Sequence, residues 1–520
     1  MFRLLISSPP VTARWQFRFA PAAGLPPLAW LARIRRRVVD IHYGASVRRD
    51  DAGFVEGTWA GPPSIDFLPD ATTVFGSGMV LHGRDLVVIT PSHQLEGMYH
   101  VRAGDVLLVS NSLVAVMVAS RLELDPAIDY SSIFTASTDA CWLLDDPAAA
   151  PAGRLVKSQL EIPTKTKSVT AQIYENLVVR PDLTTEVARK PREGAFESFA
   201  DYSRRMTEAL ASLITNASSY EPVVSLSSGY DSTAVAAVVA RVGCHRAFGF
   251  GTSRPSPHDG SVDDSGAKTA RVLGLRYDLF DRLGYLSADD LPEAEFLATG
   301  MTGEDLIFKS AEPAVRRSML LTGYWAGTQF AMSHSGDWRH ITPTTTAGAD
   351  LAEFRLRADF IHVPLPVFGA SQEPGAPRLL DRAEMQPFRV RGHYDRPIPR
   401  RLAEEAGVPR GTFGVAKRAA NILLQREGLA GMSAASLASL ERFAAAEGLS
   451  LGYRRRRPFG RLERGTIKLA DRLGAGRAVT GLKRRRVSLV HFEPHFGNLL
   501  LRWAVHTLRP RYAALESPPT

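Results

Sequence analysis

The amino-acid sequence predicts an α/β protein in which a β-rich N-terminal part precedes a doubly wound parallel sheet. In residues 1–125, short apolar runs are broken by Gly-containing turns, a pattern typical of antiparallel hairpins. From residue 222 onward, short β-branched strands alternate with apolar helices, as in βαβ units. The length of 520 residues is enough for two or three domains.

The chain divides into four parts by composition. We expect a β-rich domain over 1–142, with hairpins broken at 82–85 and 103–105 and a helix in SLVAVMVASRL. The Pro/Ala-rich and then polar stretch 143–195 is typical of a linker with a strand or two. A nucleotide-binding α/β domain is predicted over 196–440, beginning with a helix whose apolar residues recur every three or four positions. The rest, 441–520, is a basic helical element.

The composition is that of an ordinary globular protein, with 45% hydrophobic and 22% charged residues. No run of about 18 apolar residues predicts a membrane-spanning helix. The first residues are too short and too broken by prolines to predict a secretory signal. Two cysteines exclude a disulfide framework, and the expected location is the cytoplasm.

Positive charge is concentrated near the C-terminus. Residues 454–486 hold 13 Lys and Arg against two acids, a net charge of 13 − 2 = +11. Because the whole chain has a net charge of +9, the rest of the chain is close to neutral, at 9 − 11 = −2. Such a stripe suits an anionic membrane surface, which would make the protein peripheral to the membrane, or an acidic protein partner. A solvated surface without a partner is the alternative. Nucleic acid is not expected, because no interleaved aromatics accompany the charges, and the oligomeric state stays open.

The turn Ser225–Ser232 has the composition of a phosphate-binding loop between a strand and a helix. Small residues allow close backbone approach to a polyphosphate, and consecutive N–H groups at a helix N-terminus attract anions. The hydroxyls of Ser227, Ser228 and Ser232 add hydrogen-bond donors, whereas the carboxylate of Asp231 suits a magnesium ion bridging it to phosphate. An ordinary βα turn with a polar helix cap is the alternative.

The loop sequence SSGYDS resembles S-G-G-x-D-S, the pyrophosphatase loop of the N-type ATP pyrophosphatases. The surrounding chain is similar to the asparagine synthetase family and its relatives, β-lactam synthetase and the lasso-peptide cyclases, well over 196–425 and faintly over 55–125. Ser228 departs from the family, which usually has glycine there. The resemblance implies an Ntn-hydrolase-like, glutaminase-like domain followed by an adenine-nucleotide α-hydrolase-like synthetase domain. It also implies ATP, Mg²⁺ and a small-molecule or peptide carboxylate as ligands.

The implied reaction is amide formation, with asparagine biosynthesis as the family's type case. The carboxylate is activated as an acyl-adenylate with release of pyrophosphate, and ammonia or an amine then attacks. Magnesium and a lysine neutralise charge on the departing pyrophosphate.

The resemblance also assigns site residues. Leu226 and the pair Phe250–Gly251 match positions that hold adenine, and Thr322–Gly323 match a pair lying against the nucleotide. Lys417 matches the lysine that stabilises pyrophosphate, although an exposed helix lysine is the alternative.

Two further residues resemble β-lactam synthetase. Tyr324, in LTGY, and Glu353 match a Tyr–Glu pair that activates an amine, because a carboxylate can steady the positive charge passed to the tyrosine. The alternative is that Tyr324 packs and Glu353 pairs with Arg355 or Arg357.

Two departures favour a different class of function. No acid follows Gly323 in the stretch 325–328, where the family carries a second magnesium aspartate, unless Asp337 substitutes. The chain begins Met1-Phe2-Arg3, without the cysteine that glutamine-dependent members expose. Both departures are consistent with a catalytically impaired nucleotide-binding partner in a peptide or glycan biosynthetic complex. Another pyrophosphatase-loop chemistry, such as tRNA thiolation, is disfavoured by the lack of paired cysteines.

Plainer roles are alternatives for three other residues or pairs. Asp395 with Arg400 could grip a substrate anion or form an internal ion pair, the latter slightly preferred. Tyr230 and Cys244 are expected to pack rather than react.

Overall fold

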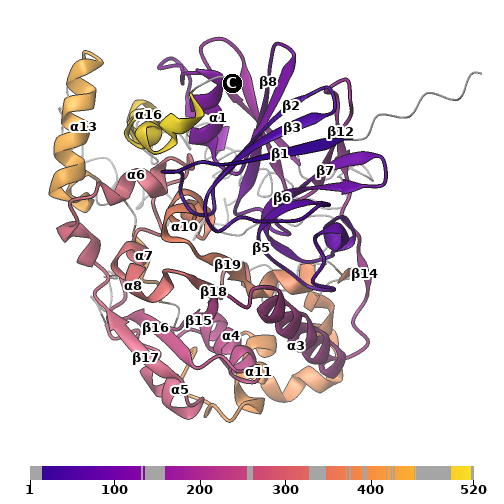
Figure 1. Cartoon of the computed structure of the whole chain (residues 1–520). Helices are drawn as coiled ribbons and strands as arrows, with labels where there is room; N and C mark the ends of the chain where they lie inside the picture. The colour runs from indigo at the N-terminus through magenta and orange to yellow at the C-terminus, as the bar shows by residue number, and fades with distance from the viewer. Residues whose placement is uncertain are drawn as a thin grey trace, which may run out of the picture.

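The fold was analysed in a computed structural model of the whole chain (Figure 1). The structure describes residues 15–130, 133–134, 158–254, 262–326, 347–370, 372–373, 376–390, 395–416, 418–422, 424, 428–449, 451 and 494–516.

The N-terminal part consists of two mainly antiparallel sheets packed face to face. One sheet has the strand order β1-β3-β2-β9-β8-β11-β10, and the other has the order β13-β12-β7-β6-β5-β4. Their shared core includes Trp30 and Leu107 from the first sheet and Phe54 and Met79 from the second. The strands are β1 (Gln16–Pro21), β2 (Trp30–Arg35), β3 (Val38–Tyr43), β4 (Arg48–Arg49), β5 (Gly53–Trp59), β6 (Val74–His82), β7 (Asp85–Ile89), β8 (Gly97–Ala103), β9 (Val106–Ser110), β10 (Gln159–Pro163), β11 (Ser168–Ile173), β12 (Asn176–Val179) and β13 (Thr185–Ala188).

Both expected hairpins are present, as β6–β7 and β8–β9, each with a positive-φ glycine in its turn. The predicted helix follows them as α1 (Leu113–Ser120), which Ser112 caps by accepting a hydrogen bond from the Ala115 N–H.

The interpretation of 143–195 as a linker is wrong for its second half. Strand β11 lies between β8 and β10 in the first sheet, and β12 lies between β7 and β13 in the second. The strands of this stretch are short, and β11 and β13 carry several polar residues, so their composition resembles that of a linker. The N-terminal sheets therefore extend to residue 188, and residues 143–157 lie outside the described part.

The second part is built on a parallel sheet of five strands in the order β17-β16-β15-β18-β19, as the alternation of strands and helices predicts. Strand order reverses between β15 and β18, and ligands bind at the carboxyl edge of such switch points. The strands are β15 (Glu221–Ser225), β16 (Arg246–Phe250), β17 (Arg276–Phe280), β18 (Ser318–Thr322) and β19 (Ile361–Pro364). The two-residue strands β14 (Glu193–Gly194) and β20 (Gln372–Glu373) pair with each other.

The helices around this sheet were partly expected. The long amphipathic helix α3 (Phe199–Asn216) starts at its Ser198 cap, and α4 follows the predicted loop. Helix α5 stops just before Gly274, whose φ of +68° suits a helix end. The helices are α4 (Tyr230–Ala240), α5 (Ala267–Val272), α6 (Pro292–Leu297), α7 (Ile307–Ser310), α8 (Glu312–Val315), α10 (Ala352–Ala358) and α11 (Pro397–Glu405).

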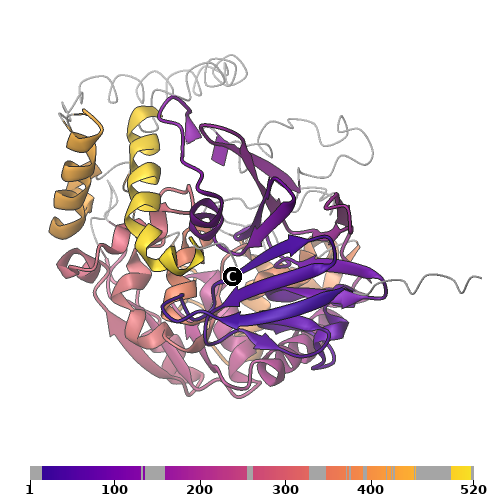
Figure 2. The ribbon, with the colours of Figure 1, turned by 45° about the horizontal axis from the view of Figure 1, so that its top comes forward.

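The C-terminal elements pack on the body of the protein. Helices α13 (Ala434–Ala446) and α16 (Pro494–Leu508) lie side by side, and α16 packs on α6 (Figures 1 and 2). The expected boundary at 440 falls inside α13, and the following segment η10 (Arg509–Leu515) packs on α1. None of the described helices is long and apolar enough to cross a membrane.

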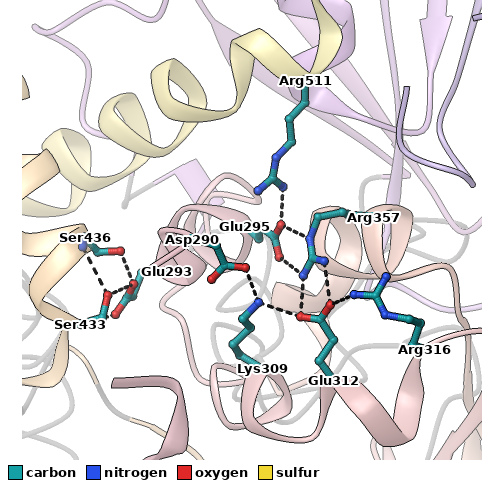
Figure 3. Close-up of polar contacts among 10 residues, drawn as sticks. All are labelled: Asp290, Glu293, Glu295, Lys309, Glu312, Arg316, Arg357, Ser433, Ser436 and Arg511. Atoms are coloured by element: carbon teal, nitrogen blue, oxygen red, sulfur yellow. Dashed lines mark hydrogen bonds and ion pairs between the residues drawn. The ribbon is translucent and has the colours of Figure 1, made fainter. Parts of the chain in front are cut away.

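Charged side chains hold these helices together (Figure 3). Arg357 of α10 bonds Glu295 and Glu312, and Arg511 of η10 also contacts Glu295. Glu293 accepts hydrogen bonds from Ser433 at the N-terminus of α13. This network fixes α10, and with it the region beside β19, relative to the C-terminal elements.

The two parts of the protein meet at a buried ion triad. Arg355 of α10 donates to Glu56 of β5 at 2.7 Å and to Glu96 at 2.7 Å, and all three side chains are buried. Burial raises the pKa of Glu56, and the Arg355 guanidinium opposes that rise. The triad therefore ties the N-terminal sheets to the helix that precedes β19.

Candidate nucleotide site

The predicted phosphate loop lies at the carboxyl edge of the parallel sheet, between β15 and α4. Gly229 occupies the N-cap position of α4, and no side chain caps this helix. Within the loop, the Ser227 N–H donates to Ser232 Oγ at 3.1 Å and the Gly229 N–H donates to Ser227 Oγ at 3.2 Å. These bonds fold residues 227–232 into a tight turn that leads directly into the N-terminus of α4, and helix N-termini attract anions.

Ser228 ties the loop to a neighbouring segment. Its hydroxyl donates to Asp264 Oδ1 at 2.6 Å, and its N–H donates to the Asp264 carbonyl oxygen at 3.0 Å. Its own carbonyl accepts from the Gly414 N–H at 2.8 Å. Ser228, at the position where the family usually has glycine, therefore stabilises the loop by bonding it to the 262–266 segment.

Thr322–Gly323, at the end of β18, lies against the start of α4. A Cβ added to Gly323 would lie 2.8 Å from the backbone carbon of Asp231 and 2.9 Å from the Ser232 nitrogen. Only glycine allows this approach without a shift of backbone. The structure thus brings two motifs together that are about 90 residues apart in the sequence.

Substituting Gly323→Ala is expected to destabilise the protein by about 1–3 kcal/mol, because the new methyl group must displace the start of α4. The matched control is Gly194→Ala, where nothing lies within 4 Å of the added Cβ. Urea unfolding measures both. Equal stability of the two variants would contradict the close packing of β18 against the loop.

Asp231 faces an arginine that sequence reasoning did not select. Arg396 Nη1 donates to Asp231 Oδ1 at 3.1 Å and to the Ala326 carbonyl oxygen at 3.2 Å. Both side chains are largely shielded, with exposed fractions of 12% for Arg396 and 21% for Asp231. Arg396 stands just before α11, and only its position next to the Pro397 helix start could have drawn attention to it.

The residues expected to hold adenine lie at neighbouring strand ends. Leu226 donates its N–H to the Phe248 carbonyl oxygen at 2.7 Å, and Gly251 donates to that of Phe280 at 3.2 Å. Phe250 is buried, with its ring near that of Phe308. The exposed side chain of Leu279 lies beside Gly251, so this edge offers apolar surface and backbone groups together.

Tyr324 is partly buried and has a carboxylate partner, which is Asp305. The Tyr324 hydroxyl donates to Asp305 Oδ1 at 2.7 Å, and the Gly348 N–H donates to Asp305 Oδ2 at 2.7 Å. Burial raises the pKa of Asp305 to about 7, against the lowering effect of the Tyr324 hydrogen bond. Burial and the adjacent Asp305 raise the pKa of Tyr324 well above its usual value.

The expected pairing of Tyr324 with Glu353 is wrong. Glu353 accepts from Ser112 at 2.5 Å and from the Tyr512 hydroxyl at 2.6 Å, so it joins α1, α10 and η10. The alternative pairing of Glu353 with Arg355 or Arg357 is wrong as well, because Arg355 bonds Glu56 and Glu96. The separation in the sequence suggested Glu353 as the partner of Tyr324. The acid that contacts Tyr324 is instead Asp305, in the turn before α7.

Thr322 has a histidine partner that the sequence did not suggest. The Thr322 hydroxyl lies 2.9 Å from His362 Nε2, and both residues are buried. Burial, the nearby His93 and Arg355 together hold the pKa of His362 well below its usual value. A neutral imidazole therefore orients the Thr322 hydroxyl beside the loop.

Several plainer readings are confirmed. Asp395 and Arg400 form an internal ion pair at 2.9 Å. Tyr230 packs its ring against Phe413 and bonds Arg400. Cys244 is buried, and burial raises the pKa of its thiol to about 11.

Other predicted residues fall outside the described part of the chain. Lys417, Asp337, residues 327–328 and the basic stretch 454–486 belong to this group. Among the described residues, no group of three or more His, Cys, Asp or Glu could hold a metal ion by itself. Asp231 nevertheless fits a magnesium ion that comes with a nucleotide, because Mg²⁺ is usually held by one or two carboxylates together with substrate phosphates.

A scan against protein-family models and a search of curated proteins both found no match to this chain.

Proposed function

We propose that this protein is an ATP-dependent amide ligase that forms AMP and pyrophosphate and lacks its own glutaminase. It activates a carboxylate as an acyl-adenylate, which ammonia or an amine then attacks. One observation carries the proposal. The 225–232 loop stands at the switch point of a parallel sheet, with Gly323 packed directly against Asp231. Two sequence motifs expected to hold one nucleotide thus converge on one place.

The residues of the loop would hold the β- and γ-phosphates through the N–H groups at the start of α4, and Asp231 would bind magnesium. Magnesium supplies charge neutralisation for the leaving pyrophosphate. The adenine would lie over the strand ends at Leu226, Phe250 and Gly251, and Thr322 would contact the nucleotide from β18. Lys417 remains the proposed lysine at the pyrophosphate.

Tyr324 and Asp305 would serve as the base for the attacking amine. The tyrosine hydroxyl would take the proton from the amine, while the Asp305 carboxylate accepts the proton that the hydroxyl already donates to it. The proposal thus keeps the tyrosine that the sequence indicated and replaces its acid. In the same scheme, the N-terminal sheets correspond to a glutaminase-like domain that has lost its reaction.

The alternative function is a nucleotide-binding partner protein with impaired catalysis. It is favoured by the engagement of the Ser227 and Ser228 hydroxyls and the Asp231 carboxylate within the protein. Under this alternative, ATP binds but pyrophosphate is not released.

Pyrophosphate release tests the proposal. With Mg-ATP and a mixed pool of carboxylates and amines, the protein should release pyrophosphate, and Asp231→Asn should lower the rate at least about 100-fold. Asp281→Asn is the control, because this exposed carboxylate follows β17 and accepts a bond from the nearby Leu283 N–H. Full activity of Asp231→Asn would show that the site is misplaced, and binding of ATP without turnover would favour the alternative function.

A further inference from the structure

The proposed reaction gives no role to Arg396, whose guanidinium contacts Asp231. Arg396 Nη1 lies within 3.4 Å of both Asp231 oxygens. This is the place where a magnesium ion would bind, so Arg396 and the metal compete for the same carboxylate in the ligand-free protein.

The described residues that follow Gly323 supply no second acid. Trp325 and Ala326, which follow Gly323 and Tyr324, carry no carboxylate, and the carbonyl of Ala326 accepts a bond from Arg396 instead. A departing pyrophosphate carries more negative charge than one divalent ion and the proposed Lys417 neutralise together. Further positive charge therefore has to come from a side chain near the loop.

We propose that Arg396 is a pyrophosphate-binding residue that supplies this further positive charge. The inference rests on the proposed function. In the ligand-free protein, Arg396 neutralises Asp231. When Mg²⁺ and a pyrophosphate group enter together, the metal takes Asp231, and the guanidinium turns to the phosphate oxygens next to it.

Three properties of Arg396 suit this role. Guanidinium binds phosphate with two parallel N–H bonds and stays charged at any physiological pH. Its position is set by the Ala326 carbonyl and by the rigid Pro397 start of α11, so the side chain needs only a small movement. Its low exposure keeps the charge in surroundings where electrostatic attraction is strong.

The role predicts two effects of opposite sign for Arg396→Ala. Titration calorimetry with magnesium pyrophosphate should show affinity lower by about 10- to 100-fold, because charge-assisted bonds to phosphate are lost. Binding of Mn²⁺ alone, measured by electron paramagnetic resonance, should become tighter, because the competing cation has left Asp231. Added guanidinium chloride should restore part of the pyrophosphate affinity.

Arg401→Ala is the matched control. Arg401 lies on α11, the helix that follows Arg396, but pairs with Glu384 and Glu405, so neither affinity should change. The inference is overturned if Arg396→Ala binds pyrophosphate as tightly as the unmodified protein, or if Mn²⁺ binding stays the same or weakens. Absence of pyrophosphate binding to the unmodified protein would instead remove the proposed function itself.

Discussion

Replacing Arg355 by methionine is expected to lower the free energy of unfolding by about 3–5 kcal/mol, the usual cost of leaving buried carboxylates without their cation. Glu56 and Glu96 would then face each other in the interior, with exposed fractions of 0% and 6%. The pKa of Glu56 would rise further without the opposing guanidinium, and the interface between the N-terminal sheets and α10 would loosen.

Urea unfolding of Arg355→Met measures this loss. Arg317→Met is the control, because Arg317 is exposed and its ion pair with Asp359 spans 3.7 Å, so its removal should cost at most about 1 kcal/mol. Combining Arg355→Met with Glu56→Gln and Glu96→Gln should recover much of the stability. A single Arg355→Met variant as stable as the control would show that the triad does not hold the two parts together.

Replacing Tyr324 by phenylalanine or Asp305 by asparagine is expected to slow amide formation by about 10²–10⁴-fold, the usual contribution of a positioned base. The step affected is attack by the amine. Adenylate formation, followed as exchange of pyrophosphate into ATP, should therefore persist in both variants. If pyrophosphate exchange and amide formation fell equally, Tyr324 and Asp305 would not be the base for the amine.

The same pair predicts a pH dependence. Because Asp305 acts as a carboxylate and its pKa is raised to about 7, amide formation should increase with pH through that value. Stability should change in the opposite direction. A carboxyl group with a raised pKa in the folded state contributes stability below its unfolded pKa of about 3.9, and this contribution is lost as pH rises towards 7. Asp305→Asn should remove both dependences, which the pH profiles of the rate and of urea unfolding would show.

The sequence predicted the elements that local patterns determine. The strand–loop–helix at Ser225–Ser232, the two hairpins and α3 all follow from turn residues and apolar spacing, and the structure places each as expected. Gly323 could also be singled out, because a glycine beside a strand end indicates a close approach.

The rest depended on contacts between distant parts of the chain. Asp305 and Tyr324 are 19 residues apart and meet only because the turn before α7 folds against the end of β18. Arg396 reaches Asp231 across 165 residues, and only its position before Pro397 distinguishes it from its arginine neighbours. Strands β11 and β12 gain their stability from pairing with earlier strands, which a Pro/Ala-rich and then polar composition cannot reveal.

The central claim is that the 225–232 loop holds the phosphates of ATP. A crystal structure of the complex with magnesium and α,β-methylene ATP tests it most directly. We predict that the β- and γ-phosphates lie against the backbone of Ser227–Ser232, with the metal on Asp231. A nucleotide bound elsewhere, with this loop still closed by its own hydroxyls, would contradict the account.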